Sequence, residues 1–202
     1  MTQAEYIDKT VLDPALRLLP SGMGSPQARA MLLAICGQEA DFTHRWQVVD
    51  PSRPEIRGPA RGLFQFERGG GVKGVLTHPA TKALAARVCA EHGIRAEVGA
   101  VHLALESDDI LAACFARLLL WSDPSPLPAI GAKSSAFDLY LRTWRPGAYT
   151  RGNRAGRLRL RKKWDEYYDQ AVAAIASKAD FSNVESGSSS TEDPIPRGDD
   201  HD

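Results

Sequence analysis

The apolar side chains between residues 25 and 40 recur with the spacing of an α-helix. The positions that share one helical face, at i, i+3, i+4 and i+7, are Ala28, Met31, Leu32 and Ile35. Ser25 suits the N-cap, and Pro26 suits the first helical position, where a missing N–H costs nothing. Glu39 is the next member of the apolar row. The pattern therefore predicts a carboxylate on the buried face of a helix, near its C-terminal end.

Such a position changes the acidity of a carboxylate. Desolvation raises its pKa, and the negative end of the helix dipole acts in the same direction. A carboxylic acid that stays protonated near neutral pH is what general acid catalysis needs. Most glutamates near helix ends are solvated, however, so Glu39 alone would be interpreted as a surface residue.

The chain after residue 78 alternates between helical patterns and proline or glycine stops. The helices predicted there span about 79–92, 95–106, 110–121, 132–144 and 156–177. Gly93 ends the first, and Pro146 with Gly147 ends the fourth. The segment 110–121 is apolar nearly all round, so we expect it at the centre of the fold.

The remaining segments have weaker patterns. Residues 1–24 are interrupted by Pro14 and Pro20 and predict a short helix or turn at the domain edge. Residues 42–77 are irregular, with short strands expected at 48–49 and 63–64, and a turn at the triple glycine 69–71. Residues 178–202 are rich in Ser, Gly, Pro and acids and predict a disordered tail. The expected organisation is an N-terminal segment 1–24, one domain 25–177 and a tail 178–202.

Charge is divided unevenly although the formal net charge is zero. Residues 1–176 hold 23 Lys/Arg and 18 Asp/Glu, whereas residues 177–202 hold 2 and 7. The segment 142–163 contains nine Lys/Arg and no acid. A solvated helix face is the default interpretation of this segment, and attraction to an anionic polymer, either cell envelope or nucleic acid, is the functional one. Aromatic RNA-binding motifs and a helix-turn-helix pattern are missing, so specific nucleic-acid recognition is not expected.

A second motif follows Glu39 at a loop's distance. Residues 62–65 read Gly-Leu-Phe-Gln: a small residue, two bulky apolar residues and an amide. With Glu39 and this motif the chain resembles the lysozyme-like superfamily, closest to soluble lytic transglycosylases and phage muralytic enzymes. Those proteins carry a catalytic Glu at a helix end, followed by Gly-Leu-Met-Gln. Here Phe64 takes the Met position, and Ala40 follows Glu39 where Ser is usual. The resemblance covers roughly residues 25–147.

The resemblance implies a fold and a set of site residues. The fold would be mainly α, of the α+β lysozyme-like type, with helices around a central apolar helix and a small loop-rich lobe beside the cleft. Glu39 would be the general acid that cleaves peptidoglycan glycan strands between MurNAc and GlcNAc. Gln65 would bind substrate or orient Glu39, and Gly62 would let the backbone approach the sugar. Phe64 would pack or stack on the substrate. Tyr140 would reach Glu39 with its hydroxyl, although Leu-Arg-Thr follows it in place of the usual Asn-Ala-Gly.

The product depends on whether a second carboxylate takes part. A transglycosylase needs only one, because the 6-hydroxyl of the sugar closes a 1,6-anhydro ring, whereas a hydrolase needs a second one to place water or stabilise charge. The candidates in the loop-rich lobe are Asp41, Asp50, Glu55 and Glu67. We select Asp50 because it follows the apolar pair 48–49; a turn residue before a proline is the competing interpretation.

Cofactors and compartment complete the expectations. The histidine spacing predicts no metal site, and no nucleotide fingerprint is present, so no cofactor is expected. Cys36, Cys89 and Cys114 lie in apolar patterns and predict buried free thiols, which favours a reducing cytoplasm. Residues 1–13 lack the apolar core of a signal peptide, and no run is long enough to span a membrane.

The biological setting comes from the resemblance. It implies a phage or prophage protein with peptidoglycan as its partner, either an endolysin or a virion component that acts at the cell wall, with virion or lysis proteins as further partners. Two alternatives stay open: a structural virion protein that keeps the fold without turnover, and a basic nucleic-acid-binding protein.

Overall fold

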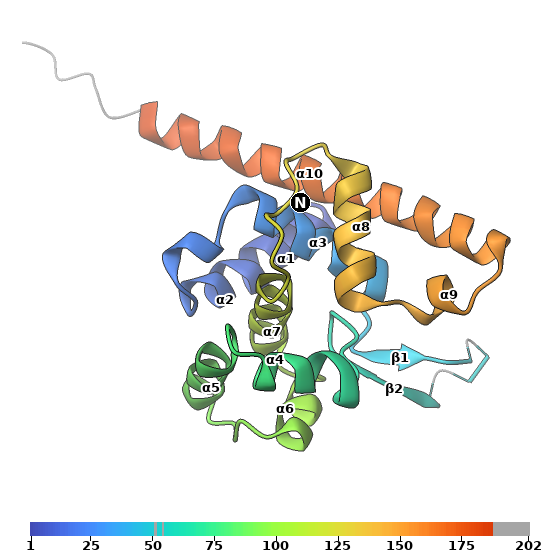
Figure 1. Ribbon diagram of the computed structural model, residues 1–202. Coiled ribbons are helices and arrows are strands. Elements are labelled where there is room, and N and C mark those ends of the chain that lie inside the picture. The colour runs from blue at the N-terminus through green and yellow to red at the C-terminus, as the bar shows by residue number, and fades with distance from the viewer. Residues whose placement is uncertain (51, 54, 188–202) are drawn as a thin grey trace, which may run out of the picture.

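The computed structural model describes residues 1–50, 52–53 and 55–187, and within them the protein is mainly helical with one two-stranded sheet (Figure 1). The helices pack around two central ones, α3 (Pro26–Ala40) and α7 (Asp109–Trp121). The sheet lies at one side of this bundle. No helix within the described ranges is long and apolar enough to span a bilayer.

The N-terminal residues form a continuous helical run of α1 (Gln3–Ile7), the π-helical turn η1 (Asp8–Leu12) and α2 (Asp13–Arg17). The break predicted at Pro14 does not occur. In the π-turn the N–H of Asp13 bonds to the carbonyl of Asp8, so the backbone is already widened where Pro14 brings no N–H. Ile7 and Leu12 are buried. The run therefore belongs to the core and not only to its edge.

Helix α3 begins as predicted, since the hydroxyl of Ser25 accepts a hydrogen bond from the N–H of Ala28 at 3.2 Å. It differs from the prediction in being buried nearly all round, Leu33 and Cys36 included. The reason is the second layer that α10 (Arg154–Gly187) adds over it. A Cβ on Gly37 would lie 2.2 Å from the ring of Tyr167, so the glycine lets the two helices approach closely.

Helix α7 has the central position that its composition predicts. Asp108 caps it by accepting a hydrogen bond from the N–H of Leu111 at 2.8 Å. It packs against α2, α3, α4 (Lys73–Thr77) and α5 (Lys82–Glu91). Arg117, its one cation, is 2% exposed and donates to the carbonyl of Met23. Burial lowers the pKa of Arg117 to about 10.

The sheet pairs β1 (Trp46–Val48) antiparallel with β2 (Arg57–Arg61), with an irregular register between them. The prediction of strands at 48–49 and 63–64 is only partly right. Val48 ends β1, but residues 63–64 lie in a tight turn that follows β2. The turn is closed by Arg61 and Phe66, which exchange two backbone hydrogen bonds at 2.9–3.0 Å. Because Arg57–Arg61 reads Arg-Gly-Pro-Ala-Arg, it lacks the apolar alternation that identifies a strand.

The helices α6 (Val98–Ala104) and α8 (Lys133–Trp144) agree with the predicted order and differ at their ends. The short helices η2 (Ser21–Met23), η3 (Arg68–Val72), α4 and α9 (Gly147–Thr150) were not predicted, and the turn expected at the triple glycine 69–71 is the π-helical η3. The predicted tail does not begin at residue 178, because α10 continues to Gly187. Residues 188–202 of that tail lie outside the described residues.

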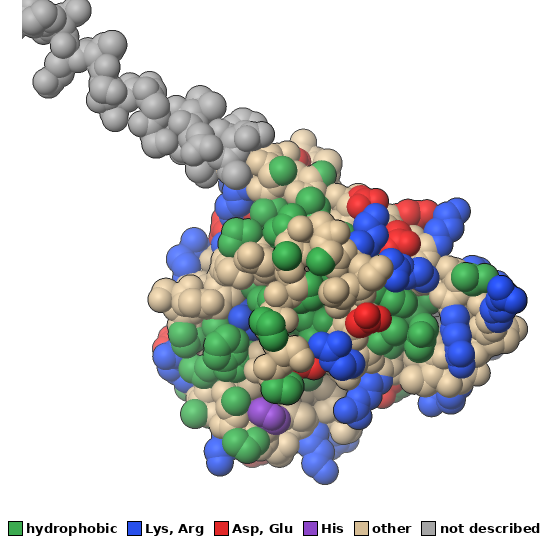
Figure 2. Space-filling model, turned by 45° about the horizontal axis from the view of Figure 1, so that its top comes forward, with side chains coloured by type: hydrophobic (Ala, Val, Ile, Leu, Met, Phe, Trp, Pro, Cys, Tyr) green, Lys and Arg blue, Asp and Glu red, His purple; other side chains and the backbone are tan. Residues whose placement is uncertain are grey.

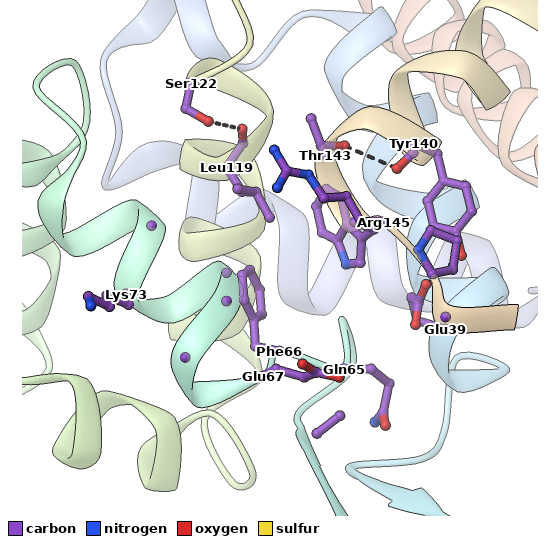
Figure 3. Close-up of a pocket in the computed structure, with 18 of the residues that line it drawn as sticks. Glu39, Gln65, Phe66, Glu67, Lys73, Leu119, Ser122, Tyr140, Thr143 and Arg145 are labelled. Atoms are coloured by element: carbon purple, nitrogen blue, oxygen red, sulfur yellow. Dashed lines mark hydrogen bonds between the residues drawn. The ribbon is translucent and has the colours of Figure 1, made fainter. Parts of the chain in front are cut away.

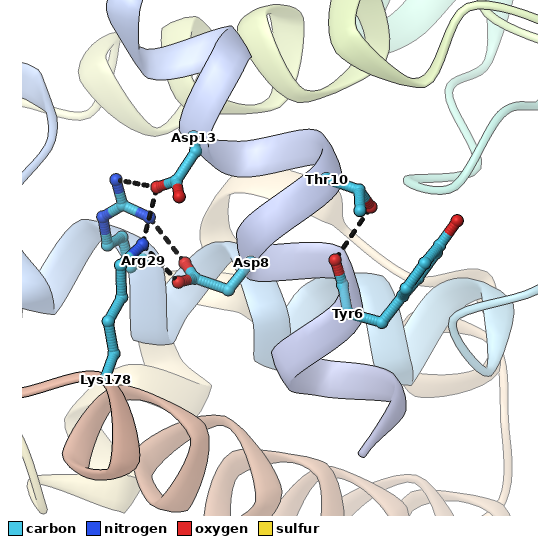
Figure 4. A network of polar contacts seen from close by, with 6 residues as sticks. All are labelled: Tyr6, Asp8, Thr10, Asp13, Arg29 and Lys178. Carbon is cyan, nitrogen blue, oxygen red and sulfur yellow. Dashed lines mark hydrogen bonds and ion pairs between the residues drawn. The ribbon is translucent and has the colours of Figure 1, made fainter. Parts of the chain in front are cut away.

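An ion-pair network anchors α10 beyond its predicted end (Figure 4). The ammonium of Lys178 lies 2.8 Å from Asp8 and 2.6 Å from Asp13. Arg29 of α3 contacts the same two carboxylates at 2.6 and 2.8 Å. The network joins three segments that are distant in the sequence and holds α10 to the core at Lys178, one residue beyond its predicted end.

Candidate active site

A cleft of about 900 Å³ separates two walls of the molecule (Figure 3). One wall is the hairpin with η3 and α4, and it contributes Gln65, Glu67 and Lys73. The other is the end of α8 with the start of α9, and it contributes Tyr140 and Arg145. Glu39 reaches the cleft from the last turn of α3. The cleft is large enough to bury several sugar residues or a ligand of similar size.

Glu39 has the acidity that its position predicts. It is half-buried, and desolvation is the main cause that raises its pKa from 4.5 to about 7. The negative charge of Glu67 acts in the same direction. The hydrogen bond from Tyr140 and the positive charge of Lys163 oppose these effects without cancelling them. The carboxyl group is therefore partly protonated at neutral pH, and both of its proton states are accessible.

Tyr140 contacts Glu39 directly. Its hydroxyl donates a hydrogen bond of 2.6 Å to Oε1 of Glu39. The ring is 1% exposed and stacks on Trp164, with centroids 4.9 Å apart and planes inclined by 19°. Burial and the charge of Glu39 raise the pKa of Tyr140, so its hydroxyl stays protonated. Tyr140 is fixed as a donor to Glu39.

Gln38, beside Glu39 in the sequence, also takes part in this arrangement. It lines the cleft and is 5% exposed. Its hydrogen bond to Tyr140 lowers the pKa of the phenol, so the amide of Gln38 donates and the phenol oxygen accepts. With that oxygen accepting from Gln38, the phenol proton points toward Glu39. The amide oxygen of Gln38 has no hydrogen-bond partner among the residues described.

Gln65 is held facing the cleft by the turn after β2. Its backbone has φ +48°, the left-handed region, and Gly62 at the start of the turn has φ +75°. The side-chain amide of Gln65 donates to the carbonyl of Gly62 at 2.9 Å. This bond uses one of the two N–H donors of the amide and fixes its orientation, and it leaves the amide oxygen to accept from a ligand in the cleft. Gln65 and Glu39 line the same cleft.

Gly62 and Phe64 do not line the cleft, contrary to the substrate-binding role expected of them. A Cβ at Gly62 would lie 2.3 Å from the carbonyl oxygen of Leu105, so the close backbone approach is to the protein and not to a sugar. The ring of Phe64 is fully buried. Its carbonyl accepts a hydrogen bond of 2.9 Å from the indole N–H of Trp144. Both residues support the turn that carries Gln65.

The structure brings Glu67, and not Asp50, to the cleft. Asp50 lies in the connection between the strands, where it accepts hydrogen bonds from Ser52 and Arg53. These bonds hold the pKa of Asp50 below its usual value. Because its oxygens serve the turn, Asp50 has the structural role that competed with the catalytic one. Glu67 lines the cleft, and its charge reaches Glu39.

Asp41 lies just beyond the end of α3, outside the cleft lining. Its carboxylate accepts from the hydroxyl of Tyr167 at 2.6 Å and pairs with Lys163 at 3.0 Å. Partial burial alone raises the pKa of Asp41, but these contacts outweigh burial and lower it. Asp41 therefore connects α3 to α10 and stays ionised.

The three cysteines are free and buried, as predicted. Burial raises the pKa of each thiol, to about 12 for Cys114. Within the part of the chain that the structure covers, no three His, Cys, Asp or Glu side chains are grouped to hold a metal ion.

Sequence reasoning missed Gln38 and Arg145, which both line the cleft. Gln38 stands next to Glu39, and adjacent helical residues normally point to different faces. Arg145 lies in the basic segment, where a solvated helix face is the default interpretation.

Comparisons of the chain with protein-family models, with curated proteins and with solved structures returned no match.

Proposed function

We propose that this protein cleaves the glycan strand of peptidoglycan between MurNAc and GlcNAc, with Glu39 as general acid. One observation carries the proposal: a half-buried carboxyl with a pKa of about 7, bonded to a buried tyrosine, faces a cleft of about 900 Å³. That acidity suits proton transfer to a glycosidic oxygen at neutral pH. Three of the residues that carry the resemblance to lytic transglycosylases, Glu39, Gln65 and Tyr140, line this cleft, whereas Gly62 and Phe64 support the turn beside it.

The first step breaks the bond between C1 of one sugar and the bridging oxygen. Glu39 gives its proton to that oxygen, and the second sugar leaves with a free hydroxyl while positive charge develops at C1. Tyr140 donates a hydrogen bond to Glu39 in both proton states and stabilises the carboxylate as it forms. Gln65 presents its amide oxygen to a sugar hydroxyl or acetamido N–H.

The second step returns the proton. The oxygen of the 6-hydroxyl bonds to C1 within the same sugar, and its proton passes to the Glu39 carboxylate. The product is a 1,6-anhydro end, and the acid is regenerated. An internal nucleophile has a high effective concentration and needs no bound water, so one carboxylate suffices.

A two-carboxylate hydrolase is the second candidate, and Glu67 favours it. This residue lines the same cleft and influences the charge state of Glu39. An ionised Glu67 would activate a water that attacks C1, and the product would be a reducing end.

The proposal includes a lysozyme-like arrangement of the fold. Helix α7 corresponds to the central apolar helix, and the β1–β2 hairpin corresponds to the small lobe. A phage or prophage origin, action at the cell wall and partners among virion or lysis proteins are part of the same proposal. A non-catalytic virion protein would keep these features and lack turnover.

Digestion of purified peptidoglycan, with mass spectrometry of the sugar ends, tests the proposal. We expect soluble fragments with 1,6-anhydro ends from the wild type and none from Glu39→Gln. Asp50→Asn is the matched control, because it removes a loop-lobe carboxylate that does not line the cleft. Equal digestion by wild type and Glu39→Gln would rule out Glu39 as the acid.

A further inference from the structure

The cations of the segment 142–163 divide into two groups. The first group is neutralised: Arg142 pairs with Asp123 at 3.1 Å, Arg161 with Asp165 at 2.9 Å, Lys162 with Glu166 at 3.9 Å, and Lys163 with Asp41 at 3.0 Å. A second group has no carboxylate within ion-pair distance in the described parts of the chain and is exposed. We name it the arginine rim, and it consists of Arg145, Arg151, Arg154, Arg157 and Arg159.

The rim continues one wall of the cleft. Arg145 lines the cleft itself, together with Gly147 of α9. The guanidinium of Arg151 lies against Gly147, where an added Cβ would be 2.6 Å from its nitrogen. Arg157 lies over the ring of Tyr149 and donates to its carbonyl at 2.9 Å. These contacts position the guanidinium groups without neutralising them, and Figure 2 shows Lys and Arg side chains gathered at the right-hand end of the molecule.

Uncompensated guanidinium groups beside a cleft attract anions, and their planar forks match carboxylates. The anion must be compatible with what lies inside the cleft. The carboxyl groups of Glu39 and Glu67 and the cations of Lys73 and Arg145 line it, so the cleft carries no formal excess of positive charge to hold a polymer with a charged backbone. A neutral backbone that carries anionic branches fits this distribution, because the backbone occupies the cleft and the branches reach the rim.

Resting on the proposed function, we infer that the arginine rim binds the free carboxylates of stem peptides on the glycan strand held in the cleft. Stem peptides are attached to muramic acid, and their terminal carboxylate is free wherever it does not take part in a cross-link. The rim would therefore make the protein prefer peptide-bearing strands over strands stripped of peptide.

Binding is measured on the Glu39→Gln variant, so that no turnover intervenes. The probes are soluble glycan strands of equal length, either with their stem peptides or stripped by an amidase and then amidated at the lactyl carboxylates that this hydrolysis exposes, so that the stripped strand is neutral. The test variant adds Arg151→Gln, Arg154→Gln and Arg157→Gln. The control variant adds Lys9→Gln, Arg17→Gln and Lys82→Gln, which remove the same charge from exposed positions outside the cleft lining.

The rim variant is expected to lose roughly tenfold or more in affinity for peptide-bearing strands, since exposed charge contacts contribute modestly but three are removed. Its affinity for stripped strands should stay within about twofold, as should both affinities of the control. The Glu39→Gln protein without further substitutions is the parent, and its preference for peptide-bearing strands should weaken as the salt concentration rises.

Three results would overturn the inference. One is an equal loss of affinity for both kinds of strand, and another is a parent that binds stripped strands as tightly as peptide-bearing ones. The third is tighter binding to a phosphodiester polymer, such as DNA of equal length. If the wild type cleaves both strands at equal rates, the rim inference fails and the proposed function stands. If wild type cleaves neither strand while the preference persists in binding, the catalytic proposal fails and the rim inference stands.

Discussion

The hydroxyl of Tyr140 lies 2.6 Å from a carboxyl oxygen of Glu39, although 101 positions separate the two residues in the sequence. The bond joins the C-terminal turn of α3 to the buried face of α8. Gln38 orients the phenol from one side and Trp164 stacks on its ring. The acidity of Glu39 therefore depends on three helices and not on its own helix alone.

Replacing Glu39 by Gln should abolish cleavage of peptidoglycan. The loss of a general acid typically costs on the order of a hundredfold or more. The amide keeps the oxygen that accepts from Tyr140, so the fold should be retained. Release of soluble fragments from a labelled wall measures the rate, and circular dichroism of the same sample checks the fold. Wild-type clearance by a folded variant would contradict the assignment.

The same variant should differ from wild type in how its stability depends on pH. The folded pKa of Glu39 is about 7 and its ordinary value is 4.5, so the folded state binds the proton more tightly. The stability that this proton contributes is fully present below pH 4.5 and is lost as the pH rises to 7. The amide side chain of the variant does not titrate. We expect equal Tm values near pH 4.5 and a Tm roughly 7–14 °C higher for Glu39→Gln at pH 8.

Thermal unfolding in matched buffers across this range tests the shift. A difference in Tm that is constant with pH would show that burial does not raise the pKa of Glu39.

Tyr140→Phe should move the alkaline limb of the activity profile upward. The hydrogen bond from Tyr140 lowers the pKa of Glu39, so its removal raises that pKa and keeps the acid protonated at higher pH. The maximal rate should fall because the forming carboxylate loses a donor. The measurement is kcat/KM as a function of pH, with Tyr149→Phe as a control on a half-buried tyrosine that does not contact Glu39. An unchanged alkaline limb of the activity profile would show that Tyr140 does not influence the pKa of Glu39.

Glu67→Gln, Asp50→Asn and Gln65→Ala together decide the reaction type. If a single carboxylate acts, Glu67→Gln retains at least roughly a tenth of the activity and the products keep 1,6-anhydro ends. Asp50→Asn should retain most activity because its oxygens serve a turn, whereas Gln65→Ala should lose more because it removes an acceptor from the cleft. Mass spectrometry of the fragments identifies the ends. Reducing ends, with inactivity of Glu67→Gln, would establish a hydrolase.

Arg29→Met should destabilise the protein by about 3 kcal/mol, because it leaves the buried carboxylate of Asp8 with Lys178 as its remaining ion-pair partner. Lys178→Met should cost less, about 1 kcal/mol, since the lysine side chain is 40% exposed. Denaturant unfolding of both variants and of the double variant measures the coupling. Equal costs for the two substitutions would contradict the assigned burial.

The sequence predicts the long helices better than it predicts their packing partners and the strands. Helix α7 was identified because its apolar positions are nearly continuous, and the Asp108 cap follows the usual pattern. The burial of α3 on all sides was missed, since periodicity detects the strongest apolar row and not the close approach that Gly37 permits. Strand β2 was missed because its pairing with β1, and not apolar alternation, determines it.

The site follows the same division. Helical periodicity predicts Glu39, and the resemblance predicts Gln65 and Tyr140; all three line the cleft. The sequence favoured Asp50 among the acids of the loop-rich lobe, but Glu67 lines the cleft and Asp50 does not, because loop geometry decides which acid faces the cleft and residue spacing does not encode it. The end of α10 was missed because Lys178 stabilises it through partners that are distant in the sequence.

The contact between α3 and α10 has a consequence for the order of events during synthesis. Asp41 and Tyr167 bond across 126 positions, and Gly37 lies directly under the same tyrosine. Until α8 and α10 have emerged from the ribosome, α10 does not cover α3 and Tyr140 does not contact Glu39. Glu39 is then solvated, and its pKa has the ordinary value. Under the proposed function, a nascent or prematurely terminated chain therefore lacks a competent acid, and the cell that makes the protein meets an active enzyme only after α8 and α10 have packed beside α3.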